Sequence, residues 1–261
     1  MDTKYCIVKS SVAPLYLNPT FKSELVSQAL IWESLVILDK KDNWYKIKQW
    51  DDYISWIHNS YILKSKINVK NKYNEWYYLN KTISKSNLVL SFASTLPVID
   101  KTNDGYYEFV YPNSKRFKIN KKYLISCNNK LKNKDIIKYA KSLMGTPYLW
   151  GGKSSFGYDC SGFIQTILLL KGINFPRDCS DQINSKLIEI NKRDKQATGD
   201  LIYFKEKDKV NHVGMFINQH NFIHSSGEVK VNSIYKKSKY YSNKLSKLDY
   251  SIYKFKDNIW M

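Results

Sequence analysis

The sequence predicts an α+β fold, in which small strand-rich modules precede a domain that begins with helices and ends with antiparallel strands. Three observations predict it. Short apolar segments alternate with polar turns through the first half of the 261-residue chain. Beyond residue 132 the apolar residues recur at helical spacing, and beyond residue 200 strand-like segments return. Helices followed by a set of antiparallel strands are typical of an α+β domain.

Residues 1–64 contain five short strand-like segments separated by polar turns, which is typical of a small β-barrel. The segments are 7–8, 15–17, 34–38, 44–47 and 53–57. Residues 65–127 repeat this pattern less clearly, with strand-like segments at 88–90, 96–99, 106–110 and 116–119 around turns at 102–105 and 111–113. We therefore expect one or two small β-barrels before the third domain.

Residues 128–261 are expected to form the third domain, which is entered through a polar linker at 128–132. Apolar residues then recur at helical spacing until Gly145 ends the first helix. These residues are Ile136, Ile137, Ala140, Leu143 and Met144. A second helix is expected from Cys160 to Gly172. Strands are expected at 201–204, 213–217, 221–224 and 251–255.

Cys160 is the strongest candidate for a catalytic residue, because it lies where a glycine-rich loop leads into an apolar helix. Asp159 is placed to cap that helix. A thiol in the first helical turn lies near the positive end of the helix dipole and near unpaired backbone N–H groups, and both favour the thiolate. The thiolate is the form of cysteine that attacks a carbonyl carbon.

Two histidines complete a candidate catalytic group. His212 lies in an apolar strand-like segment, and His224 lies 12 residues later in a short strand that ends in a turn. This separation suits a hairpin that places both rings on one face. We interpret Cys160 as the nucleophile, His212 as its base and His224 as the group that orients His212. The alternative is a set of ordinary packing residues, which is the commoner situation for a lone cysteine or histidine.

Composition limits the possible partners and location. The net charge of +19 is what an anionic partner would favour. The alternative is general basicity of the chain, because lysine is spread along its whole length. No nucleic-acid recognition motif and no apolar run of about 18 residues occurs, so neither nucleic acid nor membrane is expected as a partner. The four scattered cysteines disfavour a metal site and a disulfide framework. The first residues lack a signal-peptide pattern, so we expect a cytoplasmic protein.

Six short motifs of the third domain resemble the NlpC/P60 family of cell-wall peptidases, which are small papain-like Cys–His enzymes. The motifs lie at 148–152, 158–163, 175–178, 199–204, 212–217 and 223–227, in the order found in the family. The resemblance implies a papain-like domain with helices packed on an antiparallel sheet. It also implies a cysteine peptidase that needs no metal or other cofactor, with Cys160, His212 and His224 as the catalytic triad.

The same resemblance implies roles for residues around the nucleophile. Tyr148 would lie beside it and help to bind the oxyanion, although a packing role is the alternative. Asp159 and Ser161 would contact substrate as well as cap the helix, and Asp178 would line the same site. Cys179 stands where relatives often have Ser or Ala. Packing, substrate contact and a reversible disulfide are the roles open to it.

The N-terminal half resembles bacterial SH3-like domains, and the likeness is greatest to the γ-D-glutamyl-L-diamino acid endopeptidases, also called dipeptidyl peptidase VI. In those enzymes the first SH3-like domain walls off the cleft and helps to hold the ammonium of an N-terminal L-Ala. A carboxylate and a phenol suit this task, because an ammonium offers three donors. Glu33 and Tyr53 are the candidates, together with Asp178. The alternatives are a solvated turn acid and a core tyrosine. Trp32 stands where relatives usually have Gly. The segments that carry this resemblance are 26–33 and 51–57.

The resemblance implies a cysteine endopeptidase that cleaves the γ-D-glutamyl–diamino acid bond of murein stem peptides with a free N-terminal L-Ala, during recycling of cell-wall peptides. Murein stem peptides are the expected partners. One alternative is a secreted or wall-associated peptidoglycan hydrolase that uses SH3-like domains as wall-binding modules. Another is a binding protein built on an inactive peptidase, which the complete triad disfavours.

Overall fold

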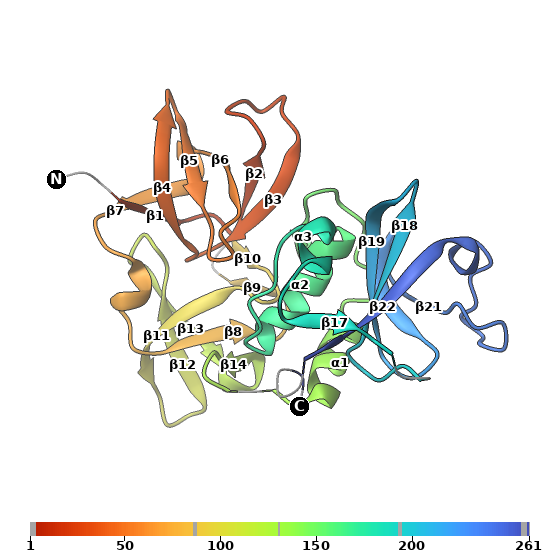
Figure 1. Ribbon diagram of the computed structural model, residues 1–261. Helices are drawn as coiled ribbons and strands as arrows, with labels where there is room; N and C mark the ends of the chain where they lie inside the picture. The colour runs from red at the N-terminus through yellow and green to blue at the C-terminus, as the bar shows by residue number, and fades with distance from the viewer. Residues whose placement is uncertain (1–3, 86–87, 130, 193–194, 257–259, 261) are drawn as a thin grey trace. The chain divides into compact units, whose positions relative to one another are not determined.

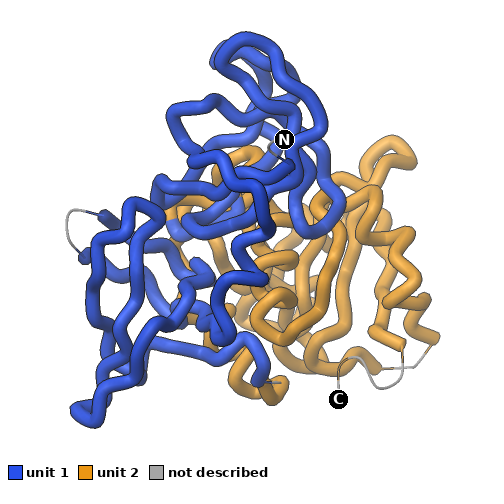
Figure 2. The backbone as a smooth tube through the Cα atoms, turned by 90° about the vertical axis from the view of Figure 1, so that its left-hand side faces the viewer, with its two compact units in different colours: residues 1–129, 153–155 blue, residues 130–152, 156–261 orange. Residues whose placement is uncertain are grey.

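The computed structural model describes residues 4–85, 88–129, 131–192, 195–256 and 260 (Figure 1). The first three residues of the predicted leaderless N-terminus, and Lys130 of the predicted linker, lie outside the described residues. The chain divides into two compact units. Unit 1 comprises Met1–Asn129 with Lys153–Ser155, and unit 2 comprises Lys130–Gly152 with Phe156–Met261 (Figure 2).

The first sheet of unit 1 has seven strands in the order β3-β2-β6-β5-β4-β1-β7. Its strands are β1 (Tyr5–Val8), β2 (Val12–Tyr16), β3 (Leu25–Leu30), β4 (Ser34–Lys41), β5 (Trp44–Lys48), β6 (Ile54–His58) and β7 (Ile62–Ser65), and the short helix η1 (Asn59–Tyr61) precedes β7. Alternate side chains point to one face of a strand, so Cys6 and Val8 of β1 meet Leu35, Ile47 and Ile57 in one buried cluster. The five predicted strands are present, and β3 and β7 were not predicted.

The second sheet of unit 1 has five strands in the order β13-β12-β11-β8-β14, and β9 and β10 form a separate two-stranded sheet. The elements are η2 (Val69–Asn71), β8 (Trp76–Leu79), β9 (Ile83–Lys85), β10 (Leu88–Leu90), β11 (Thr95–Lys101), β12 (Tyr106–Val110), β13 (Arg116–Asn120), η3 (Lys121–Tyr123) and β14 (Leu124–Ser126). Its core contains Leu79, Leu96, Phe109 and Phe117. The four strands that the sequence predicted here are present, and β8, β9 and β14 add to them.

Trp32 follows β3 of the first sheet but packs in the core of the second. Its backbone has φ = 69°, the left-handed conformation that favours glycine. The indole N–H donates a hydrogen bond to the carbonyl oxygen of Val110 at 2.7 Å. The ring packs edge-on against Tyr73 and Trp76. A tryptophan therefore occupies a glycine-type backbone position, and its side chain joins the two sheets of unit 1.

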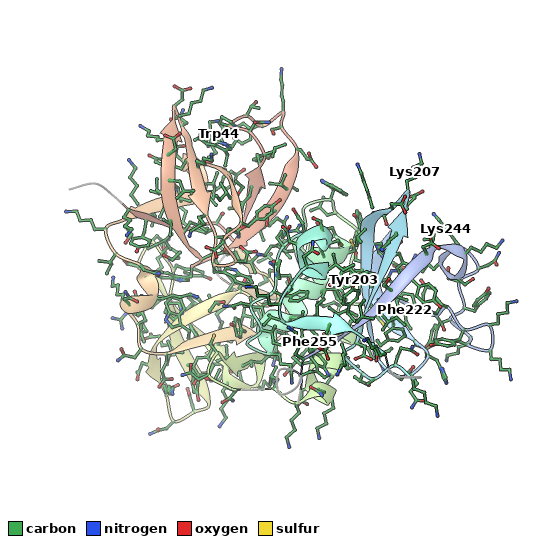
Figure 3. The ribbon with its side chains drawn as sticks, in the orientation of Figure 1. Trp44, Tyr203, Lys207, Phe222, Lys244 and Phe255 are labelled. Atoms are coloured by element: carbon green, nitrogen blue, oxygen red, sulfur yellow. The ribbon has the colours of Figure 1, made fainter. Side chains whose placement is uncertain are left out.

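In its described residues, unit 2 combines three α-helices with a six-stranded antiparallel sheet of order β17-β22-β18-β19-β20-β21. The elements are α1 (Asn133–Ser142), β16 (Gly157–Tyr158), α2 (Cys160–Leu170), α3 (Cys179–Ile183), β17 (Ile188–Ile190), β18 (Leu201–Glu206), β19 (Lys209–Phe216), β20 (Phe222–Ser226), β21 (Glu228–Asn232), η4 (Leu245–Lys247) and β22 (Asp249–Phe255), while β15 (Lys153–Ser154) belongs to unit 1. Helix α2 packs against β19 and β20. A hydrophobic cluster of unit 2 contains Ile202, Phe204, Phe216 and Phe222, the last of which is labelled in Figure 3. Partly buried residues of 234–248 pack against this cluster.

The predicted α+β class is confirmed, with strands more prominent than the sequence analysis indicated. The first sheet ends at Ser65 and the second at Ser126. The division into three domains stays a prediction. None of the helices in the described part of the chain is long and apolar enough to cross a membrane.

Candidate active site

The predicted helix start at Cys160 is present, and a side-chain cap and a close glycine contact define it. Cys160 is the first residue of α2, and Asp159 precedes it in extended conformation. The Asp159 carboxylate accepts a hydrogen bond from the Gly162 backbone N–H at 2.6 Å. A Cβ on Gly162 would lie 2.3 Å from the carbonyl oxygen of Gly152. The glycines of the motif therefore let the loop lie directly against the first turn that carries the nucleophile.

The thiol of Cys160 lies in an environment that favours the thiolate. Its Sγ atom is 3.7 Å from Sγ of Cys179 and 3.8 Å from the carbonyl oxygen of Asn211. The hydrogen bond with Cys179 is the largest cause that holds the pKa of Cys160 well below its usual range. A hydrogen bond with His212 and the charge of that ring act in the same direction, and burial opposes them. The pKa of Cys179 is raised well above its usual range, so this second thiol keeps its proton and acts as the donor.

All four cysteines are free thiols, and the other two show what burial alone does. Burial raises the pKa of Cys6 to about 12. It also raises the pKa of Cys127 to about 12. Cys160 is buried as well, so the opposite direction of its shift comes from its partners. Among the four thiols, Cys160 alone has the electrostatic environment of a nucleophile.

The two predicted histidines meet across the β19–β20 hairpin. The register pairs Met215 with Ile223, which places both rings on one face of the sheet. His212 Nε2 lies 2.6 Å from His224 Nδ1. A Cβ on Gly214 would lie 2.7 Å from the Phe222 ring and 3.3 Å from the His224 Cβ, so the missing side chain leaves room for this packing.

Asn232 is a member of the site that the sequence analysis missed. Its side-chain oxygen lies 2.9 Å from Nε2 of His224, which is fully buried. It ends β21, a strand that was not predicted. The signal was present, because Val229 and Val231 alternate with polar residues directly after the turn at Gly227.

Tyr148 lies near the nucleophile, as the resemblance implies. Its backbone N–H donates to the carbonyl oxygen of Gly227 at 2.8 Å, which ties it to the end of the β20 strand. Burial raises the pKa of Tyr148, and the negative charges of Cys160 and Asp159 raise it further. The phenol therefore keeps its proton and can donate to an oxyanion. Whether it does so stays a prediction.

Asp159 and Ser161 are held by a buried arginine. One guanidinium nitrogen of Arg177 donates to Asp159 Oδ1 at 3.1 Å and to Ser161 Oγ at 3.0 Å, and the other donates to Asp159 Oδ2 at 2.5 Å. Both polar groups thus take part in building the start of α2, and substrate contact by either stays a prediction. Asp178 directly follows Arg177 and is partly exposed at the start of α3.

Glu33 and Tyr53 lie in unit 1, where Gln49 contacts both. The Gln49 side-chain amide donates to Glu33 Oε1 at 2.7 Å, and its backbone N–H donates to the Tyr53 carbonyl oxygen at 3.0 Å. The other Glu33 oxygen accepts from the Leu30 backbone N–H at 3.2 Å. Burial raises the pKa of Glu33, whereas the positive charge of Lys153 lowers it. Glu33 is therefore a carboxylate held inside a turn and not a solvated acid.

Residues 145–248 match the model of the NlpC/P60 family, and residues 15–62 match that of the bacterial dipeptidyl-peptidase Sh3 domain. A cysteine at a helix start with a hydrogen-bonded histidine pair is the arrangement that a cysteine peptidase requires. The protein is therefore a cysteine peptidase. Its C-terminal half contains an NlpC/P60 domain, and its N-terminal half carries a bacterial SH3 domain.

Relatives and a solved structure agree with this assignment. The chain is 29% identical over 232 residues to the gamma-D-glutamyl-L-lysine dipeptidyl-peptidase of Bacillus cereus, covering 79% of this chain and 68% of that protein. It is 34% identical over 152 residues to the enzyme of the same name from Bacillus subtilis, covering 57% of this chain and 50% of that protein. The crystal structure of an NlpC/P60 family protein from Bacillus cereus shares the fold, with a TM-score of 0.81 at 22% identity over 96% of this chain and 99% of that one.

Proposed function

We propose that the protein is a γ-D-glutamyl-L-diamino acid endopeptidase that acts on murein stem peptides with a free N-terminal L-Ala. The observation that carries the chemistry is the group formed by Cys160, His212 and His224, in which the thiol lies beside both a hydrogen-bond donor and an imidazole. The substrate class is supported by the two Bacillus relatives, whose names specify the γ-D-glutamyl-L-lysine bond.

The reaction follows from the positions of these groups. The Cys160 thiolate attacks the γ-carbonyl carbon of D-Glu, and the resulting oxyanion accepts hydrogen bonds from backbone N–H groups at the start of α2 and from Tyr148. The His212 imidazolium then donates its proton to the departing amine of the diamino acid, which leaves an acyl-enzyme. His212 next takes a proton from water. The hydroxide formed attacks the carbonyl carbon of the acyl-enzyme, and the C–S bond breaks. This step releases L-Ala-γ-D-Glu and restores the Cys160 thiolate.

The selectivity for a free amine rests on Glu33 and Tyr53, together with Asp178. An ammonium offers three donors, so it is matched by carboxylate and phenol oxygens. The Lys153 charge and the two hydrogen-bond donors to Glu33 favour its ionised form against the effect of burial. These contributions offset part of the effect of burial, and an ammonium bound beside Glu33 would favour its ionised form further.

The requirement for a free amine leads to a role in recycling. In an intact wall the stem L-Ala is joined through its nitrogen to muramic acid and carries no ammonium. We place the activity in the cytoplasm, where peptides released from the wall would have a free L-Ala. The four free cysteines support a reducing compartment.

The test is to incubate the protein with L-Ala-γ-D-Glu-L-Lys and with its meso-diaminopimelate counterpart, and to detect L-Ala-γ-D-Glu by mass spectrometry. The matched controls are the N-acetylated tripeptide and purified sacculi. We expect rapid release from the free tripeptides and little from either control. Equal cleavage of the acetylated peptide would contradict the proposal. Faster cleavage of sacculi would instead support a wall-associated hydrolase whose SH3-like domain binds the wall.

A further inference from the structure

The Asn232 side chain is fixed at both ends, which determines the group that it presents to His224. Its amide nitrogen donates to the carbonyl oxygen of Tyr240 at 3.3 Å. Its amide oxygen therefore faces His224 Nε2, at 2.9 Å. An amide oxygen only accepts hydrogen bonds, so Nε2 of His224 carries the proton.

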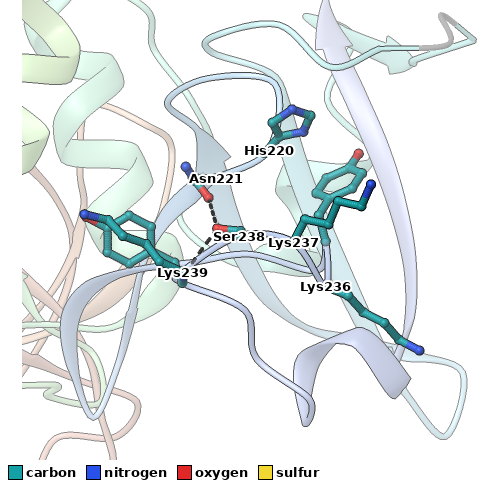
Figure 4. Close-up of a pocket in the computed structure, with 8 residues that line it drawn as sticks. His220, Asn221, Lys236, Lys237, Ser238 and Lys239 are labelled. Atoms are coloured by element: carbon teal, nitrogen blue, oxygen red, sulfur yellow. Dashed lines mark hydrogen bonds between the residues drawn. The ribbon is translucent and has the colours of Figure 1, made fainter.

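The Tyr240 carbonyl is itself held by the loop that follows β21. It accepts a second hydrogen bond from the Ser233 backbone N–H at 2.8 Å. Within the loop, Ser238 Oγ donates to the Asn221 side-chain oxygen at 2.6 Å and accepts from the Tyr240 N–H at 3.1 Å, as the dashed lines in Figure 4 show. This loop lines a cavity of about 450 Å³. Asn232 thus contacts this loop through Tyr240 on one side and His224 on the other.

The position of one proton on His224 decides the positions of the others. Burial and the charges of His212 on β19 and Lys230 on β21 lower the pKa of His224 to about 3, so this ring is neutral. A neutral imidazole with its proton on Nε2 has an acceptor at Nδ1. His212 Nε2 lies 2.6 Å from that acceptor and donates to it. The remaining nitrogen of His212, Nδ1, is then the atom that exchanges a proton with Cys160.

We propose that Asn232 is a positioning residue of this peptidase, which holds His224 in the Nε2–H tautomer and through it orients the His212 ring toward Cys160. The inference rests on the cysteine-peptidase chemistry proposed above. A neutral acceptor at this position does not add a charge that would favour protonation of His224 as the pH falls. A carboxylate would favour a doubly protonated His224, whose Nδ1–H would oppose the donor of His212.

The experiment compares Asn232→Leu, Asn232→Asp and the control Asn243→Leu, which changes an exposed asparagine of the same unit. For each we would measure kcat and KM with L-Ala-γ-D-Glu-L-Lys across pH, the pH dependence of Cys160 alkylation by iodoacetamide, and the thermal unfolding temperature. We expect Asn232→Leu to lower kcat by about 10- to 100-fold with KM little changed. Losing the correct tautomer of a catalytic histidine costs up to about 10⁴-fold where the lost group contacts that ring directly. The pH dependence of alkylation should shift to higher pH, because the His212 imidazolium is no longer oriented to stabilise the Cys160 thiolate.

Asn232→Asp distinguishes positioning from a structural role. It should approach wild-type turnover at alkaline pH, where His224 is neutral, and lose activity at a higher pH than wild type on the acid side. The inference is overturned if Asn232→Leu keeps wild-type kcat and alkylation, or if Asn232→Asp is equally impaired at every pH. Should Asn232→Leu fail to fold, the acid limb of Asn232→Asp still decides. The alkylation measurement needs no peptide substrate. If the wild-type protein does not cleave the tripeptide, the proposed substrate is refuted. The Asn232 inference is then tested by the pH dependence of alkylation alone.

Discussion

Glu33 in unit 1 and His224 in unit 2 are both titratable groups whose charged form burial disfavours, but the charges around them differ: at Glu33 the Lys153 charge opposes burial, and at His224 the neighbouring charges add to it. Burial disfavours the charged form of each, and so it raises the pKa of Glu33 and lowers that of His224. Two donors and the charge of Lys153 counteract burial at Glu33. At His224 the neighbouring charges act in the same direction as burial, and its partners are a neutral amide and a second imidazole.

The difference separates two tasks that one enzyme requires. A carboxylate that is to bind an ammonium, as we propose for Glu33, needs donors and a nearby cation to offset its burial. A group that orients a general base must stay neutral, so that one nitrogen always accepts. The four predictions that follow test this distinction, in order of decreasing expected effect.

Removing the reacting groups should have the largest effect. Cys160→Ala and His212→Ala should each lower kcat by at least about 10³-fold, since the members of such a catalytic unit act together. The measurement is release of L-Ala-γ-D-Glu at saturating tripeptide. The matched control is Cys127→Ala, which should retain activity. It removes a thiol that is far from Cys160 in the sequence and whose pKa is raised by burial. More than about 1% residual turnover in either site variant would contradict the assigned roles.

Removing the neutral His224 ring should lower kcat less than removing Cys160 or His212. His224→Ala should lower kcat by about 10- to 100-fold, because His224 orients the base without transferring a proton itself. His224→Gln keeps an acceptor for His212 and should recover part of the loss. Steady-state kinetics of the two variants at one pH make the comparison. Wild-type turnover in His224→Ala would show that the third member of the triad lies elsewhere.

Removing the charge at Glu33 should affect binding of the amine and spare the thiolate. Glu33→Gln keeps the shape of the side chain and loses its charge. We expect kcat/KM for the free tripeptide to fall by roughly 5- to 150-fold, as for loss of a hydrogen bond to a charged group worth about 1–3 kcal/mol. Tyr53→Phe should have a smaller effect in the same direction. The alkylation rate of Cys160 should not change. An equal loss for the N-acetylated peptide would argue against recognition of the ammonium.

Replacing Cys179 should shift the pH profile of Cys160 alkylation more than it changes the alkylation rate at alkaline pH. Cys179→Ala removes the donor that contributes most to the lowered pKa of Cys160, so the pKa should rise and alkylation should shift to higher pH. Alkylation should therefore slow at mildly acidic pH and stay near wild type at alkaline pH, where the thiolate is fully formed in both proteins. Cys179→Ser retains a donor and should lie closer to wild type. Identical pH profiles for all three proteins would show that the Cys179 thiol contributes nothing.

Sequence reasoning succeeded where the interactions are local. The Asp159 cap involves a backbone N–H three residues away, and the contact of His212 with His224 follows from a single hairpin. The family resemblance followed from motifs that are short and contiguous, and the α+β class followed from the order of helical and strand-like segments. Each of these signals is contained in a few neighbouring residues, so the pattern of residue types is sufficient to predict it.

The misses involve contacts that the chain makes at a distance. Lys153 lies beside the catalytic motif in the sequence, but its backbone N–H donates to Gln28 Oε1, 125 residues away. The strand that ends at Asn232 has a signal in the sequence, but the contact of Asn232 with His224 forms only when that strand pairs with β20. Met144, expected on the buried face of α1, is 50% exposed because the helix ends before it, at Ser142. Such outcomes depend on tertiary packing, which spacing along the chain does not specify.

Trp32 bears on how independent the two small sheets of unit 1 are. A non-glycine residue in the left-handed conformation costs about 1–2 kcal/mol, which burial of the indole among Tyr73 and Trp76 and its bond to Val110 offset. Excising the first SH3-like sheet alone would expose this ring and open a hole in the core that it leaves. The two sheets should therefore melt in one cooperative transition.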